Sequence, residues 1–535
     1  MALLRNGQAM QPKNIIAPVL ETIKSLGPSV PLMDRDGVFL THGRAYRESG
    51  GLLELASADT QSPLEAVRQG ALLRHVVADA LAAVEQSEDL YDFVVSQHNT
   101  AYSTHNPLQA TAGHFNITRY RSVDNYLPGL VALGAALPCI SGGGGFDMES
   151  LQFTLSIRGL RCVALLSNKT QSERGIIDSK PMPASRGQRQ QLLVVDNLQS
   201  HVQTRCVYTL INLFFTCAEH PGMAPPDFRL KEPLADMQRM IRGGHVNHSF
   251  SCIDGRKISA LEIIQRLLDW YAAQLGSDWM PAWAEREIAE ARAFVERLSQ
   301  HGLSGAVGMA DHATLHHLWQ ITLDEFGLTP QDVSLARQSL LQVARAYRGP
   351  CIFQDKAISV VRCADALAGE IGRPSTVCKD YLTAARSFMQ LAYRYGDIRH
   401  GGVYAQLVET GTTNSGVLFD SAHCRANSNT VVPKREGRAA TRGEVIRRLH
   451  SDGLSNASKA NWDQLCSASL GVLNLEDYEA TDTDCWKPVS PEQDRVTLQA
   501  AGFEALHEYM AVQRITDEEE GADSRPRHDH DDIPF

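Results

Sequence analysis

The period of the hydrophobic pattern changes near residue 259, and this change limits the fold more than any other feature of the sequence. Before it, short runs rich in β-branched and aromatic residues predict strands. These runs are LYDFVVSQ (90–97), GHFNITRY (113–120), LQFTLSI (151–157), RCVALLS (161–167) and QLLVVD (191–196). After it, apolar residues recur at helical spacing in SALEIIQRLLDWYAAQL, WAEREIAEARAFVERL and SLARQSLLQVARAY. We therefore expect one large, mostly antiparallel sheet followed by a helical middle third.

Composition places this chain among large globular proteins. Its 535 residues, 43% of them hydrophobic, can build a large core in about three domains or in one domain with appendages. The net charge of -11 gives no general attraction to nucleic acid or to anionic membranes, so neither is an expected partner. Eleven cysteines without a CxxC pair argue against zinc and disulfides and predict a cytoplasmic location. No targeting signal or membrane span is visible in the sequence.

A predicted hairpin near the N-terminus carries two acids. The segment GRAYRESGGLLELAS (43–57) holds Glu48 and Glu54 on either side of a glycine pair, and a helix is predicted over 63–85. With Gly50-Gly51 as a two-residue loop, Arg47 faces Glu54 in a cross-strand ion pair. Glu48 then shares a face with Tyr46 and Leu53, where a charge needs a partner, a metal or a substrate.

Two further patterns have both a chemical and a structural interpretation. The run GGGG (142–145) could hold a phosphate, but it lacks a Walker lysine, so a flexible loop is the favoured prediction. His312 and His316 are spaced to share a metal on one helix face, with Asp311 beside them. Without a third ligand in view, an exposed helix face is the favoured prediction.

The C-terminal third contains a basic cluster and an acidic tail. PKREGRAATRGEVIRRL (433–449) either binds nucleotide phosphates or an acidic protein tail through its arginines, or is a solvated basic helix. A strand is expected to end at 430–433, with a helix over 442–449. Eight acids in the last twenty residues predict a disordered tail. We expect a main domain over 1–415, a small C-terminal domain over 416–515 and a disordered acidic tail over 516–535.

Six stretches of the chain occur in an order shared with one known family. They are GRAYRESGGLLELASAD, HNT with GHFN, ERGIIDSKPMPAS, QLLVVDNLQSH, DGRKISALEIIQRLLDWY and GRAATRGEVIRRL. These stretches resemble motifs of the Pup ligase and depupylase family, relatives of glutamine synthetase that attach or remove a small protein modifier. The resemblance implies an α+β fold, in which helices back a concave, mostly antiparallel, glutamine synthetase-like sheet, with a small C-terminal domain.

The resemblance also implies a set of site residues. Glu54 matches a magnesium-binding glutamate, and Glu48 falls where the family keeps an aspartate that acts as base or nucleophile. Asp59 and His114 fall among the positions implied for the metal. Four arginines fall where basic residues meet ATP phosphates: Arg158, Arg174, Arg438 and Arg442. ATP and Mg²⁺ are thus the cofactors that the resemblance implies.

Several family positions are changed in this sequence. The glutamate-bearing first strand has no counterpart, Phe115 replaces a glutamate, Ser179–Pro183 replace a polar run, Leu193 replaces a histidine and His201 a glutamate. Because magnesium prefers carboxylate oxygens, these changes predict an eroded Mg-ATP centre. We expect a pseudoenzyme that acts as a binding or regulatory subunit, with an active homologue or a small protein modifier as partner. The sequence allows an oligomer but does not determine the oligomeric state. The alternative is an active ATP-dependent carboxylate-amine ligase or isopeptidase acting on a Pup-like modifier.

Overall fold

The computed structural model divides the chain into two compact units. The larger unit comprises Met1–Ile15 and Thr60–Ser428, and the smaller unit comprises Ile16–Asp59 and Asn429–Phe535. The residues that the structure describes are 3–5, 8–10, 13–33, 35–48, 52–88, 96–97, 99, 113–119, 123–167, 174–178, 189–346, 375–399, 402–409, 437–460, 464–467 and 470–475. Within these residues, no helix is both long and apolar enough to cross a bilayer.

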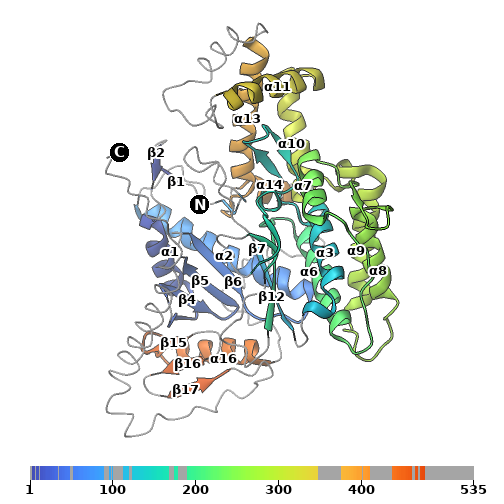
Figure 1. Cartoon of the computed structure of the whole chain (residues 1–535). Coiled ribbons are helices and arrows are strands. Elements are labelled where there is room, and N and C mark those ends of the chain that lie inside the picture. Colours follow the sequence, from blue (N-terminus) through green and yellow to red (C-terminus); the bar gives the residue numbers. More distant parts are fainter. Residues whose placement is uncertain are drawn as a thin grey trace, which may run out of the picture. The chain divides into compact units, whose positions relative to one another are not determined.

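The larger unit combines a mixed four-stranded sheet with many helices (Figure 1). Its strands are β1 (Leu3–Arg5), β2 (Gln8–Met10), β7 (Gly113–Arg119), β8 (Gly145–Asp147), β9 (Gln152–Thr154), β10 (Ala164–Ser167), β11 (Gly175–Asp178), β12 (Arg189–Val195), β13 (Ser249–Ser251) and β14 (Lys257–Ser259). Its helices are α2 (Pro63–Glu88), α3 (Leu127–Ala136), α4 (Pro138–Ser141), α5 (Ile157–Leu160), α6 (His201–Glu219), α7 (Pro233–Gly243), α8 (Ala260–Ala272), α9 (Ala284–His301), α10 (Asp311–Glu325), α11 (Pro330–Ala346), α13 (Ser375–Tyr395) and α14 (Val403–Glu409).

The main sheet of this unit has the order β10-β11-β12-β7. Strands β10 and β11 run parallel, and the other pairs are antiparallel. One apolar core joins the sheet to the helices, with Phe115 of β7 packed 4.4 Å from Tyr208 of α6 between ring centroids. The buried ring of Phe115 therefore helps to fix α6 against the sheet.

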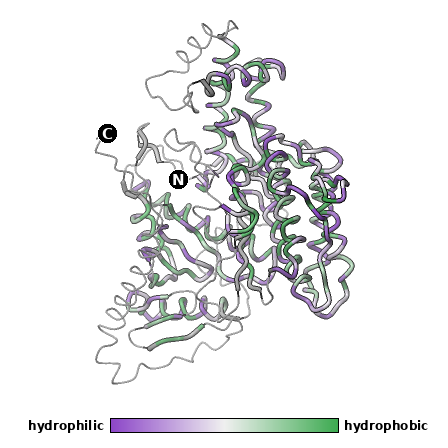
Figure 2. The backbone as a smooth tube through the Cα atoms, viewed as in Figure 1, coloured by the Kyte–Doolittle hydropathy of each residue, from purple (hydrophilic) through white to green (hydrophobic). Residues whose placement is uncertain are grey.

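The amphipathic pattern after residue 259 forms helices as predicted. In α8, the side chain of Ser259 accepts a hydrogen bond from the N–H of Glu262, which caps the helix start. Leu261, Ile264 and Leu268 are buried on one face of α8. Hydrophobic and hydrophilic stretches alternate along α8 and α9 (Figure 2), as expected of helices that cover a core.

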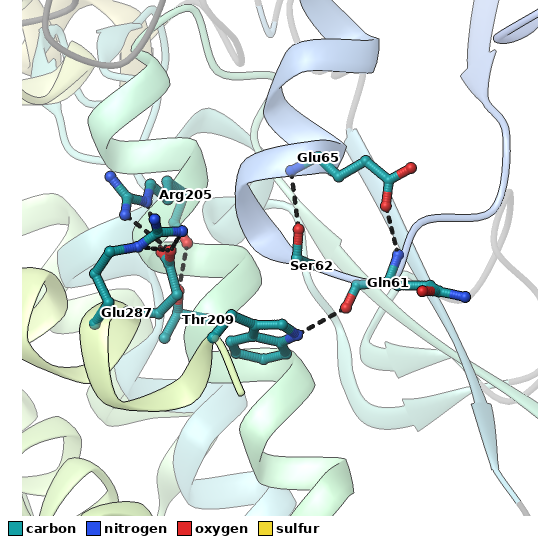
Figure 3. A network of polar contacts seen from close by, with 8 residues as sticks. Gln61, Ser62, Glu65, Arg205, Thr209 and Glu287 are labelled. Carbon is teal, nitrogen blue, oxygen red and sulfur yellow. Dashed lines mark hydrogen bonds and ion pairs between the residues drawn. The ribbon is translucent and has the colours of Figure 1, made fainter. Parts of the chain in front are cut away.

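A polar network holds the start of α2 and anchors α6 to α9 (Figure 3). Ser62 accepts a hydrogen bond from the N–H of Glu65, and the Glu65 carboxylate accepts one from the N–H of Gln61 at 2.9 Å. Arg205 of α6 forms a bidentate ion pair with Glu287 of α9 at 2.5 and 2.8 Å, almost fully buried. Such a pair fixes geometry strongly, because losing one partner leaves a buried charge.

The smaller unit is discontinuous in sequence. It contains α1 (Lys13–Leu26) from Ile16 onward, β3 (Ser29–Pro31), β4 (Gly37–Leu40), β5 (Gly43–Arg47), β6 (Leu53–Ser57), α16 (Gly437–Ser451), β15 (Ser458–Ala460), β16 (Gln464–Ser467) and β17 (Gly471–Asn474). Strands β3 to β6 form an antiparallel meander. Phe39 and Tyr46 share a core with Ile446 of α16 and Leu465 of β16. The N–H of Met33 donates to the carbonyl of Ala460, which ties the two sequence segments together.

The α+β class and the predominance of antiparallel pairing agree with the prediction. The described strands, however, form separate small sheets rather than one large sheet. The predicted boundary at 415 keeps residues 16–59 apart from the C-terminal domain, whereas in the structure both contribute to one core. Residues 90–95 of the strand predicted over 90–97, the strand end predicted at 430–433 and the tail predicted over 516–535 lie outside the described residues.

Candidate functional site

The predicted hairpin exists, but its register differs by one residue from the prediction. Strand β5 pairs with β6 so that Tyr46 faces Glu54 and Arg47 faces Leu53. The N–H of Glu48 donates to the carbonyl of Leu52 at 2.9 Å, so the connection spans residues 49–51 rather than two glycines. The predicted Arg47–Glu54 pair is therefore wrong. Because side chains alternate along strands, Glu48, Tyr46 and Glu54 lie on the same face.

Two arginines accompany the two acids of this face. The Arg35 guanidinium lies 3.6 Å from the Glu48 carboxylate. The guanidiniums of Arg35 and Arg44 lie 4.8 and 4.5 Å from the ring centroid of Tyr46, in cation–π geometry. We call Arg35, Arg44, Tyr46, Glu48 and Glu54 the acid–arginine face. The negative charges of its two carboxylates are balanced by the positive charges of the two guanidiniums.

The electrostatics of Glu54 follow from its half-buried position. Burial raises the pKa of Glu54, and the negative charge of Glu48 adds to this, while a hydrogen bond from Tyr46 and the two arginines oppose it. Burial likewise raises the pKa of Tyr46, so its hydroxyl stays protonated and donates to Glu54. The carboxylate of Glu54 is thus satisfied by groups of the protein itself.

The donors of this face do not fit a magnesium cage. Magnesium is usually held by one or two carboxylates together with waters and phosphates in octahedral geometry. Here one carboxylate is paired with a guanidinium and the other accepts from a phenol, so a divalent cation would have to displace both contacts. Within the described residues, no three His, Cys, Asp or Glu side chains form a metal-binding group.

The basic segment supplies one buried arginine. Arg442 of α16 is 1% exposed and lies over the Phe39 ring at 4.9 Å, so this residue is no part of a solvated face. Arg447 of the same helix pairs with Glu444 at the surface. Arg438 lies in the first turn of α16, and its side chain is outside the described residues. Asp59 is half-buried just after β6.

The other predicted site residues lie in the larger unit. Arg158 is buried in α5, and its N–H donates to the Asp196 carboxylate at 3.0 Å. Arg174 precedes β11, and burial followed by repulsion from Arg161 lowers its pKa. His114 is an exposed residue of β7, paired in register with Val194 of β12. The predicted residues are thus divided between the two units.

The glycine run 142–145 is a buried junction, which corrects the prediction of a flexible loop. The N–H of Gly143 donates to Asp196 at 2.8 Å. A Cβ on Gly142 would lie 2.3 Å from the carbonyl oxygen of Leu155, and one on Gly143 2.2 Å from the amide nitrogen of Asn99. The approach of Gly142 to a backbone oxygen requires glycine, whereas the atom closest to Gly143 is the end of a side chain. Burial raises the pKa of Asp196 to about 6.

The prediction of an exposed helix face for His312 and His316 is also wrong for the first turn of α10, where Asp311 and His312 are buried. Asp311 is buried and accepts hydrogen bonds from the N–H groups of Gln199 and Ser200, at 2.6 and 3.0 Å, and from the Tyr395 hydroxyl at 2.7 Å. His312 is buried with its Nδ1 2.9 Å from the carbonyl oxygen of Gly142. Burial raises the pKa of Asp311 to about 6 and lowers that of His312 to about 4.

Sequence reasoning missed the partners of the acids. Arg44 could have been found, because it alternates with Tyr46 and Glu48 along the same strand. Arg35 could not, because it reaches Glu48 from outside the hairpin. Asp196 and Asp311 were visible as residues, but their roles depend on backbone groups that are distant in sequence.

Comparisons with known proteins give one family and one fold. The family model described as Pup-ligase protein matches residues 9–340. The crystal structure of the complex between the prokaryotic ubiquitin-like protein Pup and its ligase PafA is similar, with a TM-score of 0.66 and 15% identity, over 99% of this chain and 96% of that one. The Pup ligase PafA in complex with ADP is similar with a TM-score of 0.61 and 15% identity, over 94% and 93% of the two chains. No curated protein matches the sequence.

Proposed function

The chain belongs to the Pup-ligase family, and we propose that within it this protein is a divergent member with an eroded Mg-ATP centre that works as a binding or regulatory subunit. The observation that carries the proposal is the acid–arginine face. Glu48 and Glu54 remain at the positions implied for catalysis and metal, but guanidiniums and a phenol satisfy them. A face whose acids are already neutralised favours contacts with polar or charged partners over magnesium.

The substitution at Phe115 supports the same proposal. The resemblance places a glutamate there, whereas this chain has a ring that is 7% exposed and packed against Tyr208. An apolar side chain in the core cannot bind a cation. We infer that this position serves core packing in this chain, rather than the cation binding that the resemblance implies.

The proposed partner is a small protein modifier or an active homologue. One similar solved structure is a complex of Pup with its ligase, and another is a ligase with ADP bound. These ligands belong to those proteins, and at 15% identity they support the kind of partner without fixing its identity. For this chain, we propose that binding of the modifier is retained although ATP hydrolysis is lost.

The second candidate is an active ATP-dependent carboxylate-amine ligase or isopeptidase. One observation favours it: the true register brings Glu48 and Glu54 onto a single face. A base and a metal ligand must lie close together in such an enzyme. In this alternative, substrate binding would draw the arginines away from the acids.

Measurement of ATP turnover separates the two candidates. We expect the full-length protein with Mg²⁺ and a Pup-like modifier to hydrolyse ATP well below about 1 s⁻¹ and to form or cleave no isopeptide bond. The matched variants are Glu54→Gln and, as control, Glu21→Gln, an exposed acid of α1. Turnover near 1 s⁻¹ that is lost in Glu54→Gln but kept in Glu21→Gln would establish the active enzyme instead.

A further inference from the structure

Strand β6 is the last strand at one end of the meander in the smaller unit. The strand order is β3-β4-β5-β6, so among the described residues β6 pairs on one side only, with β5. The other end of the meander has a neighbour. Leu32, just after β3, forms a parallel bridge with Ala460, and the N–H of Met33 donates to the Ala460 carbonyl. The edge at β6 therefore differs from the edge at β3.

The hydrogen bonds between β5 and β6 show which backbone groups of β6 point away from the sheet. The N–H of Ala58 donates to the carbonyl of His42 at 3.0 Å, and the N–H of Glu48 donates to that of Leu52 at 2.9 Å. In an antiparallel ladder, such hydrogen-bonded pairs alternate with pairs whose N–H and C=O groups point outward. The outward positions of β6 are therefore Leu53, Leu55 and Ser57.

These three outward positions have unpaired backbone groups. Within the part of the chain that the structure describes, the N–H and C=O groups of Leu53, Leu55 and Ser57 form no hydrogen bond. The side chains of β6 are half-buried, so the strand is in contact with solvent. A row of unpaired N–H and C=O groups is a template on which another strand can pair.

The sequence of β6 contains none of the usual devices that protect a sheet edge. Edge strands are commonly protected by lysine, by proline or by a bulge. Residues 52–58, LLELASA, contain no lysine and no proline, and β6 pairs with β5 residue by residue without a bulge. The one charged side chain, Glu54, accepts a hydrogen bond from Tyr46 on the acid–arginine face. An edge of this kind is expected to pair with a further strand.

A second copy of β6 is complementary to this edge. Antiparallel pairing about a two-fold axis at Leu55 places Leu55 opposite Leu55 of the second copy, and Leu53 opposite its Ser57. All three outward positions then face one another, and each facing pair exchanges two backbone hydrogen bonds. The edge is thus self-complementary over the whole length of β6.

The charge of Glu54 favours this register over its neighbours. An axis at Glu54 would place the two Glu54 carboxylates directly opposite each other, which is destabilising for like charges. An axis at Ala56 would place Leu53 opposite Asp59, beyond the end of β6. With the axis at Leu55, Glu54 faces Ala56 of the second copy and keeps its own contact with Tyr46.

We propose that β6 is a homodimer contact, in which two copies of the chain pair their Leu53–Ser57 strands edge to edge. A strand pair alone buries less surface than the roughly 1,200 Å² of a stable interface, so the dimer is weak and depends on concentration. The contact involves neither the modifier nor the homologue of the proposed function, and it does not depend on that function.

Sedimentation equilibrium of the full-length protein over about a hundredfold range of concentration tests the contact. We expect a monomer and a dimer in equilibrium. Leu55→Pro should raise the dissociation constant at least tenfold, because proline removes an outward N–H but none that pairs with β5. Leu55→Ala is the matched control: it loses the leucine side chain, keeps the N–H and should dimerise within about threefold of the wild type. A monomer at every concentration, or equal dimerisation of Leu55→Pro and the wild type, would overturn the proposal.

Oxidative cross-linking tests the register, and it decides the question if circular dichroism shows that Leu55→Pro does not fold. Facing residues of a hydrogen-bonded pair have Cα atoms about 5.5 Å apart, which suits a disulfide. Leu55→Cys should therefore form a cross-linked dimer on mild oxidation, with the joined peptides identified by mass spectrometry. Ser57→Cys alone should form none, whereas an equal mixture of Leu53→Cys and Ser57→Cys should. Cross-linking of Ser57→Cys as fast as that of Leu55→Cys would contradict the proposed pairing.

Discussion

Acids in the two units are satisfied in different ways. In the larger unit, Asp196 and Asp311 are fully buried and accept hydrogen bonds from backbone N–H groups that belong to other segments. In the smaller unit, Glu48 and Glu54 are half-buried and are satisfied by the side chains of Arg35, Arg44 and Tyr46. Backbone donors are fixed by the fold, whereas arginine side chains can move.

This difference separates structural acids from acids that remain available for binding. Removing a carboxylate that holds backbone N–H groups leaves buried donors unsatisfied, which costs stability. Removing one that is paired with mobile side chains at a partly exposed face costs little, because water replaces the partner. Three measurements would break or sharpen this comparison.

The largest effect is expected for Asp311→Ala. The substitution leaves the N–H groups of Gln199 and Ser200 and the Tyr395 hydroxyl without their acceptor. We expect the free energy of unfolding to fall by about 3–5 kcal/mol in urea denaturation. The control Asp324→Ala, an exposed position of the same helix, should change it by less than about 0.5 kcal/mol. Similar losses for both variants would contradict the structural role of Asp311.

A smaller effect is expected in the pH dependence of the free energy of unfolding, through the titration of Asp196. Its pKa is raised from 3.8 to about 6 on folding, so the folded state binds the proton more tightly. Its contribution to stability is therefore full below pH 3.8 and is lost as the pH rises through 6. Relative to Asp196→Asn, the wild type should lose about 2 kcal/mol of unfolding free energy between about pH 4.5 and 7.

Comparison with the variant is essential, because other groups titrate in the opposite sense. His312, whose pKa is lowered to about 4, costs stability as the pH falls below its ordinary value of 6.5. This contribution is present in both proteins and cancels in the difference. A difference that stays constant with pH would show that Asp196 is ionised throughout.

The smallest effect concerns magnesium at the acid–arginine face. Replacing Arg35 and Arg44 together with Gln removes the two positive charges beside Glu48 and Glu54. We expect the apparent affinity for Mg²⁺, measured by isothermal titration, to rise about tenfold, which corresponds to roughly 1.4 kcal/mol. Arg47→Gln, on the opposite face of β5, is the matched control. Equal affinities in all three proteins would remove the electrostatic argument for an eroded centre.

Periodic segments were predictable from the sequence, and contacts between distant segments were not. The spacing of Leu261, Ile264 and Leu268 predicted α8 correctly, because one face of this helix is buried against a core. The hairpin was also found, yet its register was missed by one residue. Two adjacent glycines allow both a two-residue and a three-residue connection, and the choice depends on packing.

The candidate site was predictable in part. Resemblance gave Glu48 and Glu54, and the structure adds Arg35 and Tyr46 as their partners. The burial of residues 142–145 could not be predicted from the neighbouring sequence. It depends on Asn99 and Asp196, which contact the glycines from other parts of the chain.

The discontinuous smaller unit has a consequence for biosynthesis. Strands β3 to β6 leave the ribosome long before α16 and β15, which complete their core, and residues 60–436 are made in between. At roughly 5–20 residues per second, this interval lasts on the order of 20–80 s. During it, Phe39 and Tyr46 lack the side chains of α16 that cover them in the finished protein. A nascent chain that stops before residue 437 therefore exposes an uncovered apolar sheet, which is a surface that chaperones bind and that aggregation exploits.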